Sequence, residues 1–140
     1  MRPNSIVNFE RIVIVSIVLG IINSWLTSDK MRALTAGKPQ MSPSTTLAIQ
    51  VVLILIYLVL IYFISRKGSP IAKWIYVVLC VLGLIAGVFT LPLMMKLGTV
   101  SLVVAVVQYA LSIASLWMLF RPDSKAWFSE GRTADPADLS

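Results

Sequence analysis

The stretch "VVLILIYLVLIYFI", residues 51–64, decides the fold. It holds no charged residue, and its polar and apolar side chains do not alternate as they do over the ~10 residues of a membrane barrel strand. It belongs to an apolar run of about 20 residues, from about Thr45 to Ile64, which is the length a helix needs to cross a hydrocarbon core ~30 Å thick. Backbone groups in lipid must be paired within such a segment, and a helix pairs them. The stretch therefore predicts a transmembrane helix.

Three further apolar runs accompany it, at about residues 6–26, 74–95 and 97–120. Of the 140 residues, 58% are hydrophobic and 13% are charged, whereas soluble domains have roughly 45–50% and about 25%. The first run is expected to be an uncleaved anchor rather than a secretory signal, because Glu10 interrupts it and no small-residue cleavage site follows. The predicted fold is all-α, an integral membrane bundle of four antiparallel helices.

The segments between the runs predict one domain over residues 1–128. The links "SRKGSP" (65–70) and "KLG" (96–98) are expected to be tight turns, which make neighbouring helices antiparallel. Residues 27–44 are expected to form one long outer loop; a short helix over residues 30–36, ended by Gly37 and Pro39, and a plain flexible loop are both open. Residues 129–140 have too little apolar content to fold, so a disordered cytoplasmic tail is predicted.

The basic residues predict the orientation in the membrane. Of the 12 Lys and Arg residues, one side of the predicted bundle receives Arg2, Arg11, Arg66, Lys67, Lys73, Arg121, Lys125 and Arg132. The other side receives Lys30, Arg32, Lys38 and Lys96. Because short loops rich in Lys and Arg stay in the cytoplasm, both termini are expected to be cytoplasmic. The basic residues sit in short segments between apolar runs, which suits anionic lipid headgroups and not nucleic acid.

Several residues at the membrane boundary are expected to anchor the helices. The apolar run ends at Phe120, and Pro122 then stops the helix. A new turn that starts at Asp123 or Ser124 is expected to return Trp127 to the interface, where Trp commonly lies. A role of this aromatic segment in docking a partner is the alternative. Glu10 is expected at the membrane surface, paired with the neighbouring Arg11. The expected interface anchors are Arg11, Arg66, Lys67, Arg121 and Trp127.

The chemistry of catalytic sites is missing from the sequence. No Asp, Glu, Lys, Arg or His lies deep in any apolar run, and such residues usually mark proton relays and ion paths. There is no histidine, and Cys80 is the single cysteine, which excludes disulfides and Cys/His metal sites. A nucleophile would have no base beside it. We therefore expect no enzyme, no cofactor and no metal.

Small and polar residues recur at steps of three and four along three of the four runs, and each set marks one helix face. Such residues let helix backbones approach closely in lipid. Helix packing is the first interpretation, and a polar groove for a small ligand is the second; Asn23 and Gln108 are expected to hydrogen-bond across helices. The second run lacks such a face and is expected to face lipid more. The faces comprise Ser16, Gly20, Asn23 and Thr27; Cys80, Gly83, Gly87 and Thr90; and Ser101, Ala105, Gln108, Ser112 and Ser115.

These patterns predict two kinds of function. The first is a non-enzymatic multi-pass membrane protein that works by helix association, as an accessory or scaffold subunit or as a homo-oligomer, with Gly83 and Gly87 as a possible dimer face. The alternative is a small exporter or carrier of hydrophobic molecules that uses the polar face with Asn23 and Gln108. The lipid bilayer is the expected environment in both cases, and a protein partner or a second copy is expected in the first.

The two ends of the chain carry a resemblance. "RPNSIVNFE" (2–10) and "FRPDSKAWF" (120–128) resemble the end motifs of small, uncharacterised four-helix inner-membrane proteins of proteobacteria. The resemblance spans the chain and implies a bacterial cytoplasmic membrane. It implies no activity, no cofactor and no site residue.

Overall fold

The structure is a computed structural model that describes residues 2–133. Within this part the chain forms five helices and no strand, which confirms the all-α fold. Four of the helices are long and apolar, and α4, the shortest of them, has 21 residues, enough to span about 30 Å. The helices are α1 (Asn4–Leu34), α2 (Pro43–Lys67), α3 (Pro70–Leu97), α4 (Thr99–Leu119) and α5 (Pro122–Thr133).

Short capping motifs set where the long helices begin and end. The hydroxyls of Ser42 and Ser69 each accept a hydrogen bond from a backbone N–H in the first turn of α2 and of α3, and a proline follows each serine at the first helical position. Gly68 ends α2 in the left-handed conformation, with φ 59°, which glycine adopts without strain. Gly98, with φ 116°, is the whole link between α3 and α4. The two predicted tight turns are confirmed.

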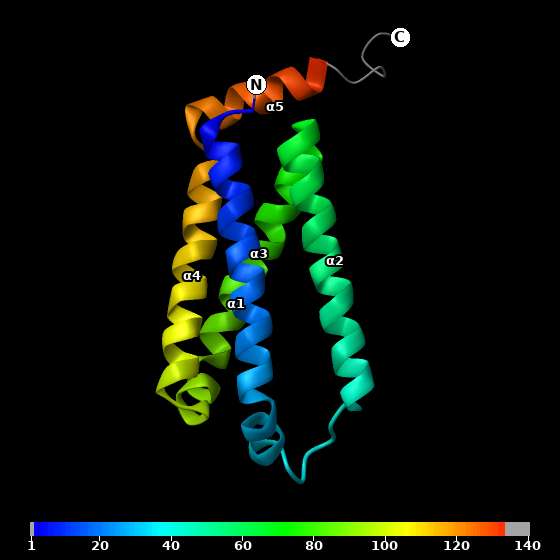
Figure 1. Ribbon diagram of the computed structural model, residues 1–140, viewed down its shortest axis with the longest axis vertical. Coiled ribbons are helices and arrows are strands. Elements are labelled where there is room, and N and C mark those ends of the chain that lie inside the picture. The colour runs from blue at the N-terminus through cyan, green and yellow to red at the C-terminus, as the bar shows by residue number, and fades with distance from the viewer. Residues whose placement is uncertain (1, 134–140) are drawn as a thin grey trace.

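The long helices pack as an antiparallel bundle (Figure 1). α1 packs chiefly on α4, and α4 also packs on α3, whereas α2 makes fewer contacts with α1 and α3. The N-terminal segment, the α2–α3 turn and α5 lie together at one end, called the α5 end below. The segment between α1 and α2 and the α3–α4 turn lie at the opposite end, called the loop end.

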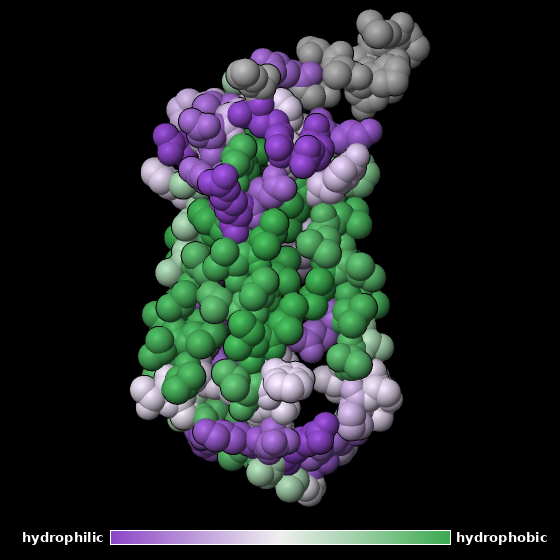
Figure 2. All heavy atoms as spheres, viewed as in Figure 1, coloured by the Kyte–Doolittle hydropathy of each residue, from purple (hydrophilic) through white to green (hydrophobic). Residues whose placement is uncertain are grey.

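An apolar belt crosses the visible face of the bundle (Figure 2). Hydrophobic side chains cover the middle of the visible face, and polar ones gather at both ends. Many large hydrophobic residues of the four long helices are exposed, among them Val18, Leu55, Ile85 and Val103. Water would disfavour such a surface, whereas a bilayer covers it. The chain is therefore a multi-pass membrane protein.

The predicted outer loop over residues 27–44 is wrong at its start, because α1 continues to Leu34 and leaves residues 35–42 as the link to α2. Between Leu26, the end of the apolar run, and Gly37 there is no glycine or proline, so the change to polar side chains marks the membrane boundary and not the end of the helix. The Thr27 hydroxyl donates to the Asn23 carbonyl of the same helix. The Lys30 ammonium donates to the carbonyl of Leu97 at 3.2 Å, which fastens the projecting turns of α1 to α3.

The predicted disordered tail over residues 129–140 also needs correction, because α5 extends to Thr133; residues 134–140 lie outside the described part. The helix begins at Pro122, just before the start expected at Asp123 or Ser124, and lies across the α5 end of the bundle (Figure 1). Phe128 is buried, and the Lys73 ammonium lies 4.9 Å from the centre of its ring. This docking holds α5 against the end of the bundle.

The hydrophobic core is concentrated toward the α5 end. Its fully buried members include Ile6, Phe9, Ile64 and Leu119, which come from three long helices. Tyr76 of α3 completes the cluster and is almost fully buried. Toward the loop end, most of α2 is exposed within the chain. The difference leaves space between α2 and the other helices, and this space is the candidate site.

Candidate functional site

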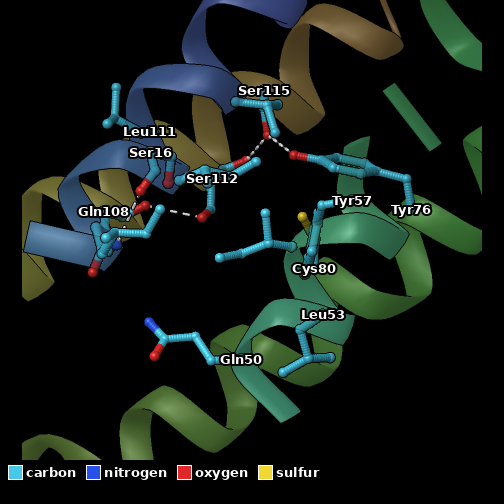
Figure 3. Close-up of a pocket in the computed structure, with 15 residues that line it drawn as sticks. Ser16, Gln50, Leu53, Tyr57, Tyr76, Cys80, Gln108, Leu111, Ser112 and Ser115 are labelled. Atoms are coloured by element: carbon cyan, nitrogen blue, oxygen red, sulfur yellow. Dashed lines mark hydrogen bonds between the residues drawn. The ribbon is translucent and has the colours of Figure 1, made fainter. Parts of the chain in front are cut away.

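A cavity of about 390 Å³ lies between the four long helices (Figure 3). Each helix supplies part of its wall, and the side chains that line it are apolar or neutral and polar. In the space-filling view a polar patch shows through the hydrophobic belt between α1 and α2 (Figure 2). Six of the lining residues carry the argument below: Ser16 and Gly20 of α1, Gln50 and Tyr57 of α2, Tyr76 of α3 and Gln108 of α4.

The wall between α1 and α4 is the seam of small residues that the sequence predicts. The side-chain amide of Gln108 donates from Nε2 to the backbone carbonyl of Ser16 at 3.2 Å. Gly20 makes room for this contact, since a Cβ there would lie 2.9 Å from the same nitrogen. The expected interhelical hydrogen bond of Gln108 is therefore confirmed, and it lies at the middle of the membrane-spanning helices.

Asn23 lies nearer the loop end, outside the cavity, on the same seam. The hydroxyl of Ser101 donates to Oδ1 of Asn23 at 3.4 Å, so the second predicted interhelical bond is also confirmed. Both residues border a smaller pocket at the loop end, together with Thr27 and Lys30. The polar face of α1 is thus divided: Ser16 and Gly20 reach the central cavity, and Asn23 does not.

A chain of hydroxyl groups runs along the α4 side of the cavity toward the α5 end. Ser112 donates to the carbonyl of Gln108 at 2.9 Å, and Ser115 donates to the carbonyl of Ser112 at 2.7 Å. The Tyr76 hydroxyl lies 2.8 Å from Oγ of Ser115. Because the single hydrogen of Ser115 is used by the carbonyl, Tyr76 is the donor to Ser115. Tyr76 is a site residue that the sequence analysis did not identify.

Aromatic rings close the cavity at the α5 end. Phe9 and Tyr76 meet edge to face with ring centres 5.0 Å apart, and Tyr57 and Tyr76 do so with ring centres 5.9 Å apart. Edge-to-face pairs at these distances are favourable beyond their burial. Leu60 and Ile61 of α2 are buried in the same core, so a path from the cavity to this end is blocked.

Most of α2 is exposed within the chain, as its expected lipid-facing position requires, but one face of this helix also lines the cavity. Gln50, Leu53, Ile54 and Tyr57 all line the cavity, at steps of three and four along the helix. The signal is present in the sequence, because Gln50 and Tyr57 are seven residues apart and so share a face. It is faint because aliphatic residues separate the two polar ones.

Two polar groups of the α2 wall have no hydrogen-bond partner among the described residues: the amide of Gln50 and the hydroxyl of Tyr57. Both groups reach the cavity surface. The side-chain amide of Gln108 is only partly used, because its nitrogen contacts Ser16 and its oxygen has no partner in this part of the chain. Gln50 and Gln108 lie on opposite walls (Figure 3).

The expected face of α3 is split by the structure. Gly87 is buried, and a Cβ there would overlap the ring of Tyr109 on α4. Gly83 faces away from the other helices, and a Cβ there would meet nothing within 4 Å. Cys80 lines the cavity. Gly87 therefore packs within the bundle, and Tyr109, its contact, is a residue that the sequence analysis did not identify.

The expected anchors gather at the α5 end. Arg11, Arg66, Lys67 and Arg121 are exposed there, as a role in contacting headgroups requires. Trp127 is more deeply integrated than an interfacial anchor, because its indole nitrogen donates to the carbonyl of Ile64 at 3.1 Å and joins α5 to α2.

The predicted pair of Glu10 with Arg11 is wrong. Glu10 accepts from the guanidinium of Arg2 at 2.9 Å and from the hydroxyl of Ser65 at 2.6 Å, whereas Arg11 is exposed. Adjacent residues of a helix point about 100° apart, so they do not face each other. The Glu10 side chain, 26% exposed, lies at the α5 end, where it joins α1 to α2.

No family model, curated protein or solved structure matches this chain. The function is therefore argued from the cavity itself. Its walls offer hydrogen bonds and apolar contacts, and none of the lining residues is Asp, Glu, Lys or Arg.

Proposed function

We propose that the protein binds a small hydrophobic molecule inside the bilayer and acts as a carrier or exporter of such molecules. The cavity between the four long helices is the observation that supports this proposal. At about 390 Å³ it lies within the 300–1,000 Å³ that is typical of small-molecule sites. Like such sites, it combines mainly apolar walls with a few polar groups.

The proposed function is non-enzymatic and needs no cofactor or metal. A carrier driven by protons would need a carboxylate at the binding site, and the lining residues include none. The tyrosines and Cys80 offer no acid–base pair for hydrolysis or group transfer. The proposal is therefore binding and movement of a molecule without chemical change.

We place the protein in a bacterial cytoplasmic membrane with both termini in the cytoplasm. The α5 end carries the N-terminal segment, the α2–α3 turn and α5, and with them most of the Lys and Arg residues. Such an excess favours the cytoplasmic side. The resemblance of the two end motifs to proteobacterial inner-membrane proteins supports the same location. The cavity would then be open toward the outer half of the membrane.

The test is binding of a fluorescent hydrophobic probe to the purified protein in mild detergent. Replacing Ile54 by Trp fills the cavity and is expected to abolish binding. The neighbouring Leu55 is exposed and does not line the cavity, so Leu55→Trp is the matched control and is expected to bind normally. Equal binding by both variants would contradict the proposal. Flux of the same probe across liposomes then distinguishes a carrier from a storage protein.

A second candidate is association with a protein partner or another copy of the chain, as an accessory or scaffold subunit. Gly83 favours it, because this small residue lies on an outward face of α3 between the exposed Leu82 and Ile85. In lipid, a small residue on an open face lets another helix approach closely. Light scattering in mild detergent is expected to give an oligomer that Gly83→Leu dissociates and Val81→Leu does not. A monomer without any co-purified partner would exclude this candidate.

A further inference from the structure

We infer that the cavity takes a neutral single-chain amphiphile with a hydroxyl or amide head, held between Gln50 and Gln108. The inference rests on the proposed function and adds the chemical class of the ligand. Three observations support it: polar groups without hydrogen-bond partners lie at membrane depth, no charged residue lines the cavity around them, and the cavity is small and open toward the bilayer.

Polar groups without partners are costly inside a bilayer, where each costs several kcal/mol. Gln50 follows Pro43, the first residue of α2, by seven residues, or about 10 Å along the helix. Gln108 lies near the middle of α4. The Gln50 amide and the Gln108 oxygen together offer donors and acceptors on opposite walls. A hydroxyl or amide, which donates and accepts at once, is the head that uses both.

Charge selects against fatty acids and amines as ligands. The nearest ionic groups lie at the two ends of the bundle: Glu10 is held by Arg2 at the α5 end, and Lys30 is bound to the Leu97 carbonyl at the loop end. Neither end places a counter-ion in the cavity wall. An ionised head would therefore enter a low-dielectric site without a partner, which is strongly unfavourable.

The size and the opening of the cavity favour a single chain. A group of the size of a water molecule takes up about 30 Å³. The cavity of about 390 Å³ therefore has room for roughly a dozen such groups, fewer than a two-chain lipid contains. Phe9, Tyr57 and Tyr76 block the α5 end. Leu53 of the α2 wall is exposed although it lines the cavity, so the tail is expected to leave the cavity sideways past α2, into the bilayer.

The experiment uses the purified full chain in nanodiscs and three photoreactive probes that share one tail. The first probe is a long-chain alcohol, the second is the corresponding fatty acid at a pH where its carboxylate is ionised, and the third is the plain hydrocarbon. Labelled residues are located by mass spectrometry. The expected result is labelling of the cavity by the alcohol at about tenfold lower concentration than by the hydrocarbon, since one neutral hydrogen bond corresponds to about that factor. Labelling by the carboxylate is expected to be weaker than by the alcohol, because its charge has no partner in the cavity.

Two variants sharpen the result. Gln50→Leu is expected to remove the preference for the alcohol and to leave labelling by the hydrocarbon unchanged. Gln40→Leu is the matched control, because Gln40 is exposed and bonds only to the carbonyl of Thr35. The preference of the wild-type protein is a readout that does not depend on either variant folding.

The outcomes separate the inference from the proposed function. Equal cavity labelling by alcohol and hydrocarbon, or stronger labelling by the carboxylate, would overturn the inference and leave the proposed function standing. Labelling by no probe above the level of Ile54→Trp would overturn both.

Discussion

The two halves of the bundle are built differently. At the α5 end, side chains of α1, α2, α3 and α4 interlock in one core, and Phe9 and Ile64 have no exposed surface. Toward the loop end, α2 stands away from the others, and Leu53 remains 48% exposed although it borders the cavity. Helices in lipid associate through close packing and hydrogen bonds, because the lipid is as apolar as they are. The stability of the fold is therefore concentrated at the α5 end, and the capacity to bind lies where packing is loose.

The largest loss of stability is expected when an aromatic ring is removed from the tightly packed α5 end. Phe9→Ala leaves a hole beside Tyr76 and is expected to lower the free energy of unfolding by about 3–5 kcal/mol. Leu53→Ala, in the loose half, is expected to cost less than about 1 kcal/mol, since little contact is lost. Unfolding by SDS titration in mild detergent measures both. Equal losses would show that the two halves are packed alike.

The second prediction sharpens the comparison within one helix. Gly87→Ala pushes against Tyr109 of α4 and is expected to destabilise the protein by about 1–3 kcal/mol, the usual cost of overpacking. Gly83→Ala meets no atom and is expected to raise stability by about 0.5–1 kcal/mol, because alanine favours the helix. The same SDS titration measures the stability of both variants. A destabilised Gly83→Ala variant would show that its face is covered by a second chain.

The seam between α1 and α4 was predictable because the small and polar residues fall at helical spacing against an aliphatic background. Ser16, Gly20 and Gln108 mark faces that have to meet, since each would otherwise present polar groups or gaps to lipid. The four spans followed from length and composition alone. Both are properties of single helices, which a sequence carries directly.

The remaining features depend on relations between segments. The polar end of the first apolar run marks the membrane boundary, but polar side chains alone do not end a helix, and α1 runs on to Leu34. The partners of Glu10 are Arg2, eight residues earlier, and Ser65 on another helix. Tyr57 and Tyr76 become a closed end only when α2 and α3 are folded against α1. None of these contacts has a fixed spacing along the chain.

Breaking the ion pair between Arg2 and Glu10 at the α5 end is expected to cause a smaller loss of stability. Glu10→Gln removes the charge that binds Arg2 and weakens the contact with Ser65, so a loss of about 1 kcal/mol is expected. Arg11→Gln changes a neighbouring charge that is exposed, and no loss is expected from it. If Arg11→Gln lost as much stability as Glu10→Gln, the overall charge of the α5 end would matter and not the ion pair between Arg2 and Glu10. Thermal unfolding at two salt concentrations measures both variants, because screening weakens the link.

The smallest expected effect is that of pH on the attachment of α5 to the bundle. The hydroxyl of Ser5 donates to the Asp123 carboxylate, and this bond, with Arg121 nearby, lowers the pKa of Asp123 below its ordinary value of 3.8. A carboxyl group with a lowered pKa in the folded state stabilises that state above pH 3.8 and loses its contribution as the pH falls through the lowered pKa. The attachment of α5 is therefore expected to be insensitive to pH near neutrality and to weaken only in strong acid.

Ser5→Ala tests this link without disturbing the core below it. The pKa of Asp123 is expected to rise toward 3.8 in this variant, as measured by ¹³C NMR titration of the aspartate carboxyl carbons. Ser129→Ala is the matched control, because Ser129 also lies on α5 but donates only to the carbonyl of Ala126. If the Asp123 titration were unchanged in Ser5→Ala, the hydroxyl would not be what holds the first turn of α5 to α1, and the docking would rest on the other contacts of α5, such as those of Ser124 and Trp127.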